Sequence, residues 1–397
     1  MRPFPRSSLY MILLLMTLPL CWRAGAQDKK AEAAPDVLVL NNGDTLHGKL
    51  VQEVGGTVTF HSDPLGDLTV KWDKIRSLQA TENFAVLRTG VKLRGKRAAA
   101  RLPEGSLEVT DQTVAIHPTN QEPAGAPIPV KDVQVIVSQA EMDKQLHHEP
   151  GFFGGWNGAA TAGATLVQAT QNQYSVSGSV GLVRVVPTAT WLDPRNRTSA
   201  DFSGSYGKIT QPAYTSGGVL FPAVVTKASI SHFDAERDEY ISPRFFGLGQ
   251  TAFDHNYGQD LNLQQIYGGG LGWTALKTSK QEADLKGTVQ YEKQSFISGA
   301  ASANQNLVGS TISADYLLKL KLVTLTQGVA FVPAFNNARA YSANETDTFA
   351  FPAYKQFSFS VGTLDSYLND PPATAPPTKR NSFQFTMGLT YAFKSKD

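Results

Sequence analysis

Four residues in the second half of the chain have the types that acyl hydrolysis uses, and they are Ser229, Ser231, His232 and Asp234. A serine hydroxyl becomes a nucleophile when a histidine takes its proton and a carboxylate orients that histidine. The sequence contains no G-x-S-x-G segment, and His255 is the only other histidine beyond residue 150. We therefore expect ordinary strand and turn residues here, and a protein that is not an enzyme.

A second group has the types that bind metals. His147, His148 and Glu149 are consecutive, however, and consecutive residues do not share a helix face. The single cysteine, Cys21, excludes any zinc cluster built on cysteines. We expect a solvated linker here, and no metal or other cofactor.

A third group carries charges at positions that alternate with apolar ones. Asp284 and Lys286, for example, share a face that opposes Leu285. The set that we expect to line an interior comprises Asp201, Asp284, Lys286, Glu292, Asp315 and Lys319. Two interpretations stay open for it. The opposite charges either pair into a plug, or they line a narrow polar path for small solutes.

The elements that must position these charges are long strands of period two. In residues 383–393 every odd position is apolar, from Phe383 to Phe393, and the even positions are polar or small. Soluble sandwiches use strands of about five or six residues. These runs cover about 10 to 15 residues, the length that crosses a bilayer when tilted. Because all backbone groups must be paired in lipid, the pattern predicts a closed barrel.

Turn residues divide this part of the chain into twelve strands. Their expected starts lie near Gly154, Asn172, Asn196, Pro222, Tyr240, Leu261, Glu282, Leu307, Leu322, Glu345, Gln356 and Asn381. An even number of strands returns the chain to the side from which it entered, which we expect to be the periplasm.

Aromatic content divides the chain near residue 150. Residues 27–149 contain only Phe60, Trp72 and Phe84, whereas residues 150–397 contain 33 aromatic residues. Aromatic girdles flank the apolar band of membrane barrels. We therefore expect a periplasmic domain over 27–137, a linker over 138–150, and an outer-membrane β-barrel over 151–397.

The pattern of residues 27–137 predicts a small SH3-like or Sm-like β-domain that is duplicated. Asn42-Gly43 is a strong hairpin signal. Gly43, Leu46, Gly48 and Lys49 recur at a constant offset of 47 as Gly90, Leu93, Gly95 and Lys96, and Val70-Lys71 recurs as Val130-Lys131. The repeat predicts two copies of one β-unit. We expect this domain to contact a periplasmic protein or peptidoglycan.

The first 26 residues have the pattern of a secretory signal peptide. Arg2 and Arg6 precede the apolar run 9–22, and Ala24-Gly25-Ala26 is an A-x-A cleavage site. The formal net charge of the whole chain is only +2, which excludes a nucleic-acid binder that works by bulk charge.

Five short segments appear in a familiar order. They are Gly155-Trp156-Asn157-Gly158, the glycine-rich run 266–273, Val289-Gln290-Tyr291-Glu292, the run 365–372, and Tyr391-Ala392-Phe393. In them the chain resembles the salt-induced outer-membrane protein family, domain of unknown function 481, over roughly residues 151–393. The resemblance implies a β-barrel in the outer membrane, and it brings no catalytic residues.

Together the patterns predict an all-β chain, an antiparallel transmembrane β-barrel of about twelve strands after a small duplicated β-domain. We expect a non-enzymatic outer-membrane protein of the salt-induced, envelope-stress type, in a Gram-negative type of envelope, with a largely closed lumen. The alternative is a narrow channel for ions or small solutes. The expected partners are outer-membrane lipid, the barrel-assembly machinery and the periplasmic contact of residues 27–137, and no nucleic acid.

Overall fold

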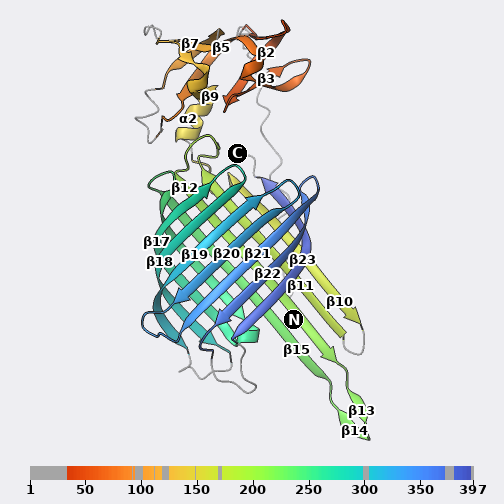
Figure 1. The fold of residues 1–397 in the computed structure, drawn as a ribbon. Helices are drawn as coiled ribbons and strands as arrows, with labels where there is room; N and C mark the ends of the chain where they lie inside the picture. Colours follow the sequence, from red (N-terminus) through yellow and green to blue (C-terminus); the bar gives the residue numbers. More distant parts are fainter. Residues whose placement is uncertain are drawn as a thin grey trace, which may run out of the picture.

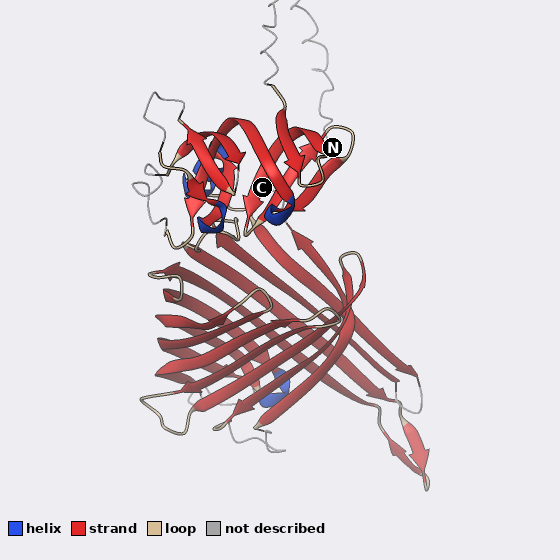
Figure 2. Ribbon diagram, turned by 45° about the horizontal axis from the view of Figure 1, so that its top comes forward, coloured by secondary structure: helices blue, strands red, loops and turns tan. Residues whose placement is uncertain are grey.

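The computed structural model describes residues 34–91, 93, 102–110, 112–118, 125–147, 149–168, 172–297, 304–371 and 380–394. The segment expected to be a signal peptide lies outside these ranges. Two β-structures make up the molecule, a small N-terminal domain and a long barrel (Figure 1). Strands form nearly all of both parts, as Figure 2 shows.

The N-terminal domain is one strongly curved sheet. Its strands run in the order β4-β3-β2-β1-β5-β6-β7-β8, and β9 pairs with both β2 and β5. Its elements are β1 (Asp36–Leu40), β2 (Thr45–Val54), β3 (Thr57–Ser62), β4 (Gly66–Lys71), η1 (Trp72–Lys74), β5 (Ile75–Arg88), β6 (Glu104–Thr110), β7 (Thr113–His117), β8 (Ile128–Pro129), η2 (Val130–Asp132), β9 (Val133–Ser138) and α2 (Gln139–His147).

The domain repeats one structural unit, with a different residue correspondence from that expected. The first turn agrees, since Gly43 and Gly90 both have positive φ, +95° and +82°. The next glycine pair differs from the expectation. Gly48 packs against the His61 carbonyl, and the glycine that packs in the same way against the His117 carbonyl is Gly105 rather than Gly95.

The second half of the repeat shifts in the same way. Both η1 and η2 are single 3-10 turns, and they begin at Trp72 and Val130. The structural counterpart of Val130 is therefore Trp72 and not Val70. The backbone N–H of Trp72 donates to Gly56, and that of Val130 donates to Gln112. A longer connection between β5 and β6 changes the spacing from 47 to 57 residues between Gly48 and Gly105. Gly95 and Lys96 lie outside the described residues.

The barrel closes from twelve antiparallel strands, each paired with the next, and the last paired with the first. The strands are β10 (Trp156–Gln168), β11 (Asn172–Val186), β12 (Asn196–Gln211), β15 (Val224–Tyr240), β16 (Phe245–Asn256), β17 (Leu261–Lys277), β18 (Gln281–Phe296), β19 (Gln305–Lys319), β20 (Thr324–Pro333), β21 (Tyr341–Tyr354), β22 (Phe357–Leu368) and β23 (Asn381–Lys394). The expected all-β class and twelve strands are confirmed.

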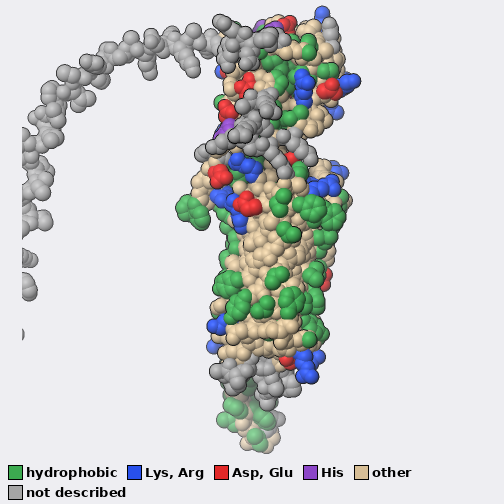
Figure 3. Space-filling view, turned by 90° about the vertical axis from the view of Figure 1, so that its left-hand side faces the viewer, with side chains coloured by type: hydrophobic (Ala, Val, Ile, Leu, Met, Phe, Trp, Pro, Cys, Tyr) green, Lys and Arg blue, Asp and Glu red, His purple; other side chains and the backbone are tan. Residues whose placement is uncertain are grey.

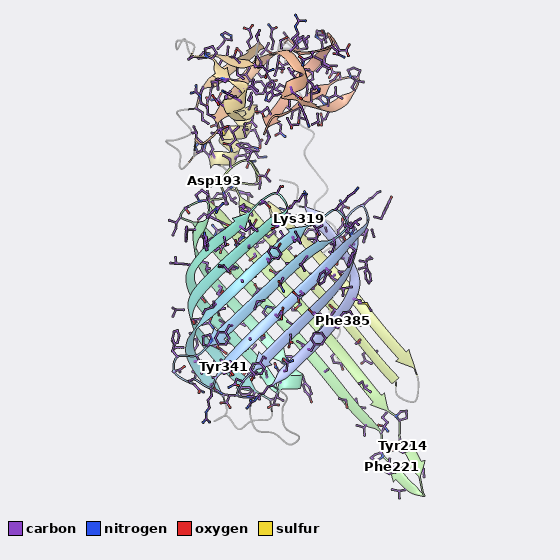
Figure 4. The ribbon with its side chains drawn as sticks, viewed as in Figure 1. Asp193, Tyr214, Phe221, Lys319, Tyr341 and Phe385 are labelled. Carbon is purple, nitrogen blue, oxygen red and sulfur yellow. The ribbon has the colours of Figure 1, made fainter. Side chains whose placement is uncertain are left out.

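Strand boundaries differ from the sequence expectation mainly at Tyr240. This residue ends β15 and does not begin the next strand, which starts at Phe245. The Tyr240 ring lies 5.2 Å from the Phe246 ring, so the tyrosine belongs to the interior. A separate hairpin of β13 (Tyr214–Ser216) and β14 (Val219–Phe221) extends from the barrel end remote from the N-terminal domain (Figures 1 and 4). We call the two ends of the barrel the domain end and the hairpin end.

The outward face of the barrel is apolar in its middle. Leu271 is 66% exposed and Val289 is 63% exposed, each pointing away from the barrel. Charged side chains gather toward the two ends of the face shown in Figure 3. Aromatic pairs mark both ends, with Tyr341 stacked on Tyr367 at the hairpin end and Phe357 against Tyr391 at the domain end. This distribution is typical of barrels that span a membrane.

The helix α2 connects the two parts and contacts the turn between β11 and β12. Its Gln145 Oε1 accepts hydrogen bonds from the Thr188 hydroxyl (3.2 Å) and the Ala189 N–H (3.1 Å). Arg195 donates to the Leu146 carbonyl at 2.6 Å. Trp191 packs against the apolar cluster that contains Met142. The stretch 139–147 is thus a helix held at both the domain and the barrel.

Candidate functional site in the barrel lumen

The polar face of the barrel wall points into the lumen. On β18, Asp284 and Glu292 are each 3% exposed. The intervening odd-numbered residues, such as Val289, are exposed on the outside. Because successive strand residues point to opposite faces, the even-numbered residues of β18 face inward. The strand register carries this assignment to the neighbouring strands, where Asp284 pairs with Asp315.

Arg197, the second residue of β12, occupies the lumen near the domain end. Its guanidinium bonds three carboxylates, Asp238 at 2.7 Å, Glu282 at 3.1 Å and Asp284 at 2.6 Å. The Phe246 ring lies beneath it, with a guanidinium carbon to ring centroid distance of 5.3 Å. A planar guanidinium with five N–H donors can satisfy such a set, whereas an ammonium cannot. This cluster fills one side of the lumen.

Lys286 forms a second ion cluster nearer the middle of the barrel. Its Nζ lies 2.6 Å from Glu236 Oε1 and 2.8 Å from Asp315 Oδ2. The Lys286 and Glu236 side chains are nearly buried, but the Asp315 side chain is 50% exposed. Since Asp315 faces inward, that exposure means that the middle of the lumen has free space beside this carboxylate.

His232 lies between two carboxylates closer to the hairpin end. Its Nδ1 is 2.5 Å from Asp254 Oδ1, and its Nε2 is 3.0 Å from Asp234 Oδ1. With both carboxylates ionised, the two contacts are hydrogen bonds when both ring nitrogens carry a proton. Ser231 adjoins His232 on one strand and so points to the other face. The hydrolase arrangement considered for Ser231 and His232 is therefore not assembled.

Side-chain amides and hydroxyls fill the next level. Glu292 accepts hydrogen bonds from Gln264 and from Gln294, the latter at 2.6 Å. Gln290 accepts a hydrogen bond from Thr311. These groups extend the packed wall formed by β16 to β19 toward the hairpin end.

A short turn folds across the lumen at the hairpin end. It is η3 (Tyr257–Gln259), and Asn256 caps it through a bond from the Gln259 N–H. The Gln259 amide donates to the carbonyls of Ser366 (3.0 Å) and Arg380 (2.9 Å), which belong to the opposite wall. His232, Ser342 and Tyr367 line a cavity beside this turn. The turn therefore narrows the lumen at this end.

The opposite wall of the lumen carries small neutral side chains. Thr161, Thr390 and Ser360 form a chain of hydroxyl contacts, each 2.7 Å long, across the closing strands. By register the same wall also presents Thr326, Asn344, Thr346, Thr348, Ser358, Ser366, Ser382 and Thr386. Among the described residues of β20 to β23 and β10 to β11, the only charged inward position is Lys394 at the rim. Below its rim this wall is therefore polar or apolar and uncharged.

The inward charges are strongly unbalanced. Between the two rims, nine carboxylates face the lumen: Asp201, Asp234, Glu236, Asp238, Asp254, Glu282, Asp284, Glu292 and Asp315. Within the described strands the bases on this face are Arg197, Lys286 and His232, and by register Lys277, Lys319 and Lys394 join them at the domain-end rim. Asp201 pairs in register with Asp234, so two carboxylates face each other across adjacent strands. By formal charge the inward face between the rims is therefore negative.

Five of the six residues singled out from the sequence lie on the inward face away from the rims. They are Asp201, Asp284, Lys286, Glu292 and Asp315. Lys319 ends β19 and lies at the domain-end rim (Figure 4). Sequence reasoning missed Arg197 and Glu236, because Asn196 and Thr198 flank the first and Arg237 follows the second, so neither stands out in an apolar alternation.

Metal ligation finds no support in the parts of the chain that the structure describes. No group of three or more His, Cys, Asp or Glu side chains converges there. His147 lies 3.8 Å from Asp143 on α2, and His148 is outside the described residues. None of the described helices has both the length and the apolar content needed to cross a membrane.

One electrostatic feature lies in the N-terminal domain. Glu53 is fully buried, and its Oε1 accepts a hydrogen bond from the Gly56 N–H at 2.7 Å. Burial raises the pKa of Glu53 to about 7, more than this backbone hydrogen bond lowers it.

Comparison with known proteins gives a family and a set of distant folds. A family model described as "Protein of unknown function, DUF481" matches residues 160–393. No curated protein matches the chain.

Three of the solved structures that match are remote in sequence. An outer membrane channel from Pseudomonas putida F1 is 14% identical, covering 62% of this chain and 100% of its own, with a TM-score of 0.33. A bacterial polysaccharide outer membrane secretin is 8% identical, covering 61% and 99%, with a TM-score of 0.30. OprB of Pseudomonas putida is 12% identical, covering 64% and 95%, with a TM-score of 0.25.

Proposed function

We propose that this chain, which belongs to the DUF481 family, is a non-enzymatic outer-membrane β-barrel that offers small cations a narrow path through its lumen. The observation that carries the proposal is the charge imbalance of the inward face between the rims, nine carboxylates against Arg197, Lys286 and His232. Rings of carboxylates favour cations in pores because they replace part of the ion's lost hydration.

The membrane location rests on the outward face. Its apolar middle and aromatic ends match a bilayer with two interfaces, and a closed barrel leaves no strand edge facing lipid where its ladder is complete. In an outer membrane the N-terminal domain and both ends of the barrel chain would face the periplasm. Export would require the signal peptide expected in residues 1–26, and insertion would require the barrel-assembly machinery.

A second candidate function is a barrel whose lumen is closed. The Arg197 cluster and the bonds from Gln259 to Ser366 and Arg380 favour it, because both narrow the lumen near its ends. Such a protein would act through its surfaces. Its periplasmic residues 27–137 would then contact a protein or peptidoglycan.

Electrical recording separates the two candidates. The refolded mature chain is placed in a planar bilayer with a KCl gradient. Steady single-channel current steps whose reversal potential lies toward that of K⁺ support the cation path. Silence from a demonstrably folded barrel, or a reversal potential toward that of Cl⁻, would overturn it.

The salt-induced role implied by the family resemblance remains a further part of the proposal. It predicts that the amount of the protein in the envelope rises when the external NaCl concentration rises. Immunoblots of membranes from cells grown over a range of NaCl concentrations test this, with sucrose of equal osmolality as the control. A protein level that does not change with NaCl would contradict the salt-induced role, and the proposal of a cation path would be unaffected.

A further inference from the structure

The closing seam of the barrel is only half formed. β10 and β23 share six residue pairs, from Asn157–Lys394 to Ala162–Leu389, whereas β11 and β12 share fifteen. Within the described strands, no ladder pair joins residues 163–168 to residues 381–388. Figure 1 shows β10 and β11 leaning away from β23 toward the hairpin end.

An incomplete ladder is costly inside a membrane. Each unpaired backbone N–H or C=O in hydrocarbon raises the free energy of the folded state by several kcal/mol. Two open strand edges are therefore unstable against acyl chains. Water from the lumen can solvate the edges, or the seam can zip closed and pair them. While the edges are solvated in this way, the lumen and the membrane communicate at this seam, and zipping would end that communication.

On β23 the outward side of the seam carries exposed apolar side chains. Phe383, Phe385 and Met387 of β23 are 62%, 54% and 57% exposed. Phe385 stands on the outer wall beside β10 and β11 in Figure 4. Small residues of β10 stand at the last formed rungs of the seam, where Ala160 faces Tyr391 and Ala162 faces Leu389, and Ala164 follows them toward the hairpin end.

The inward side of the same seam is polar and uncharged. The Thr386 hydroxyl contacts the Gly362 carbonyl at 3.3 Å, and Thr390 bonds Thr161 and Ser360. The carboxylates that dominate the lumen stand on the opposite wall and would repel an anion. A bound molecule would therefore combine an apolar chain with a neutral, zwitterionic or cationic head.

We propose that the hairpin-end half of the β10–β23 seam is a lateral port between lumen and membrane for a single-chain amphiphile of that kind. Its chain would lie along Phe383, Phe385 and Met387, and its head would contact the hydroxyl wall. The inference uses the membrane location from the proposed function but not the cation path.

Photolabelling of a lockable seam tests the port. Ala164→Cys with Met387→Cys places cysteines at the first outward rung beyond the last pair, and Ala162→Cys with Leu389→Cys places them at that last pair. The chain after Ala26 contains no other cysteine. Each protein, in phosphatidylcholine vesicles, receives a lysophosphatidylcholine with a diazirine in its acyl chain, and peptide mass spectrometry maps the label.

We expect label concentrated in residues 381–389 of the reduced proteins. Closing the 164–387 pair by oxidation, or by a short bismaleimide, should abolish that label, and reduction of the disulfide should restore it. The 162–389 disulfide should leave the label in place. Label spread evenly over the outward strands, or label that survives the 164–387 closure, would overturn the port.

Two further arms make the result specific. A fatty acid with the same diazirine chain should label residues 381–389 less, and equal labelling would overturn the assignment of the head group. Conductance recorded on the same proteins separates the two proposals, because loss of the port with normal conductance leaves the cation path intact.

Discussion

Lys286 and Asp315 lie on neighbouring strands, with Lys286 Nζ 2.8 Å from Asp315 Oδ2. The same ammonium is 2.6 Å from Glu236. One ammonium thus partly offsets the negative charge of two carboxylates in the middle of the lumen. The half-exposed Asp315 side chain is where this network meets the water of the lumen.

Removing that base should raise cation preference and lower stability together. In Lys286→Met, Glu236 and Asp315 lose their shared partner, and a broken buried pair typically costs about 3 to 5 kcal/mol. Because Asp315 is half exposed, we expect a loss near the lower end. Denaturant unfolding in detergent and the KCl reversal potential measure the two effects. Lys293→Met, on the outward face of the same strand, is the matched control and should change neither. A stable variant with unchanged selectivity would contradict the network.

Arg197 should not tolerate lysine. An ammonium cannot hold Asp238, Glu282 and Asp284 in the planar geometry of the guanidinium, so Arg197→Lys leaves carboxylates unsatisfied. We expect a destabilisation of about 2 kcal/mol or more. The temperature at which the folded band disappears on an unboiled gel measures it. Arg237→Lys is the control, since its pair with Glu239 is exposed and worth about 1 kcal/mol or less. Equal shifts for both variants would refute the special role of Arg197.

The stability of the N-terminal domain should fall as the pH rises toward neutrality. The pKa of Glu53 is about 7 in the folded domain, above its ordinary value of 4.5. The folded state therefore binds more protons than the unfolded state between these values, and its stabilisation is present at pH 4.5 and lost through pH 7. We expect on the order of 1 to 2 kcal/mol across this range.

Thermal unfolding of the N-terminal domain within the full chain, followed by Trp72 fluorescence, tests this dependence. Glu53→Gln should flatten the profile, because an amide does not titrate and can still accept the bond from Gly56. Glu108→Gln, an exposed carboxylate in the same sheet, serves as the control. Stability that rises with pH over this range would be inconsistent with the buried acid.

The joint between the two parts should become a protease site when its hydrogen bonds are removed. Arg195 donates to the Leu146 carbonyl at 2.6 Å near the end of α2. Arg195→Ala should speed cleavage between Ser138 and Gly151 several-fold and leave a resistant C-terminal fragment, because a frayed helix end exposes its backbone. Time courses with a broad-specificity protease, read by mass spectrometry, measure the rate. Arg244→Ala, in the next domain-end turn, should cleave like the unmodified protein.

Local pattern was enough to predict the barrel, because alternation and strand length depend on neighbouring residues. Its charge network could not be predicted in the same way. Arg197 bonds Asp238 and Glu282, which are 41 and 85 residues away, and these pairings exist only after the register is set. His232 appeared as a hydrolase candidate because Ser231 and Asp234 lie close to it in sequence, whereas its partner Asp254 lies on the next strand. The repeat failed in register because an insertion between β5 and β6 shifted Gly105 relative to Gly48.

The most direct test of the cation path is the KCl reversal potential of the mature chain and of an Asp201→Asn, Asp315→Asn variant in the same bilayer. Asp201 pairs in register with Asp234, and Asp315 is half exposed to the lumen, so both carboxylates act on a passing ion. We predict a reversal potential toward that of K⁺ for the unmodified chain and a clear shift toward zero for the variant. Identical reversal potentials, or a preference for Cl⁻ in the unmodified chain, would contradict the account.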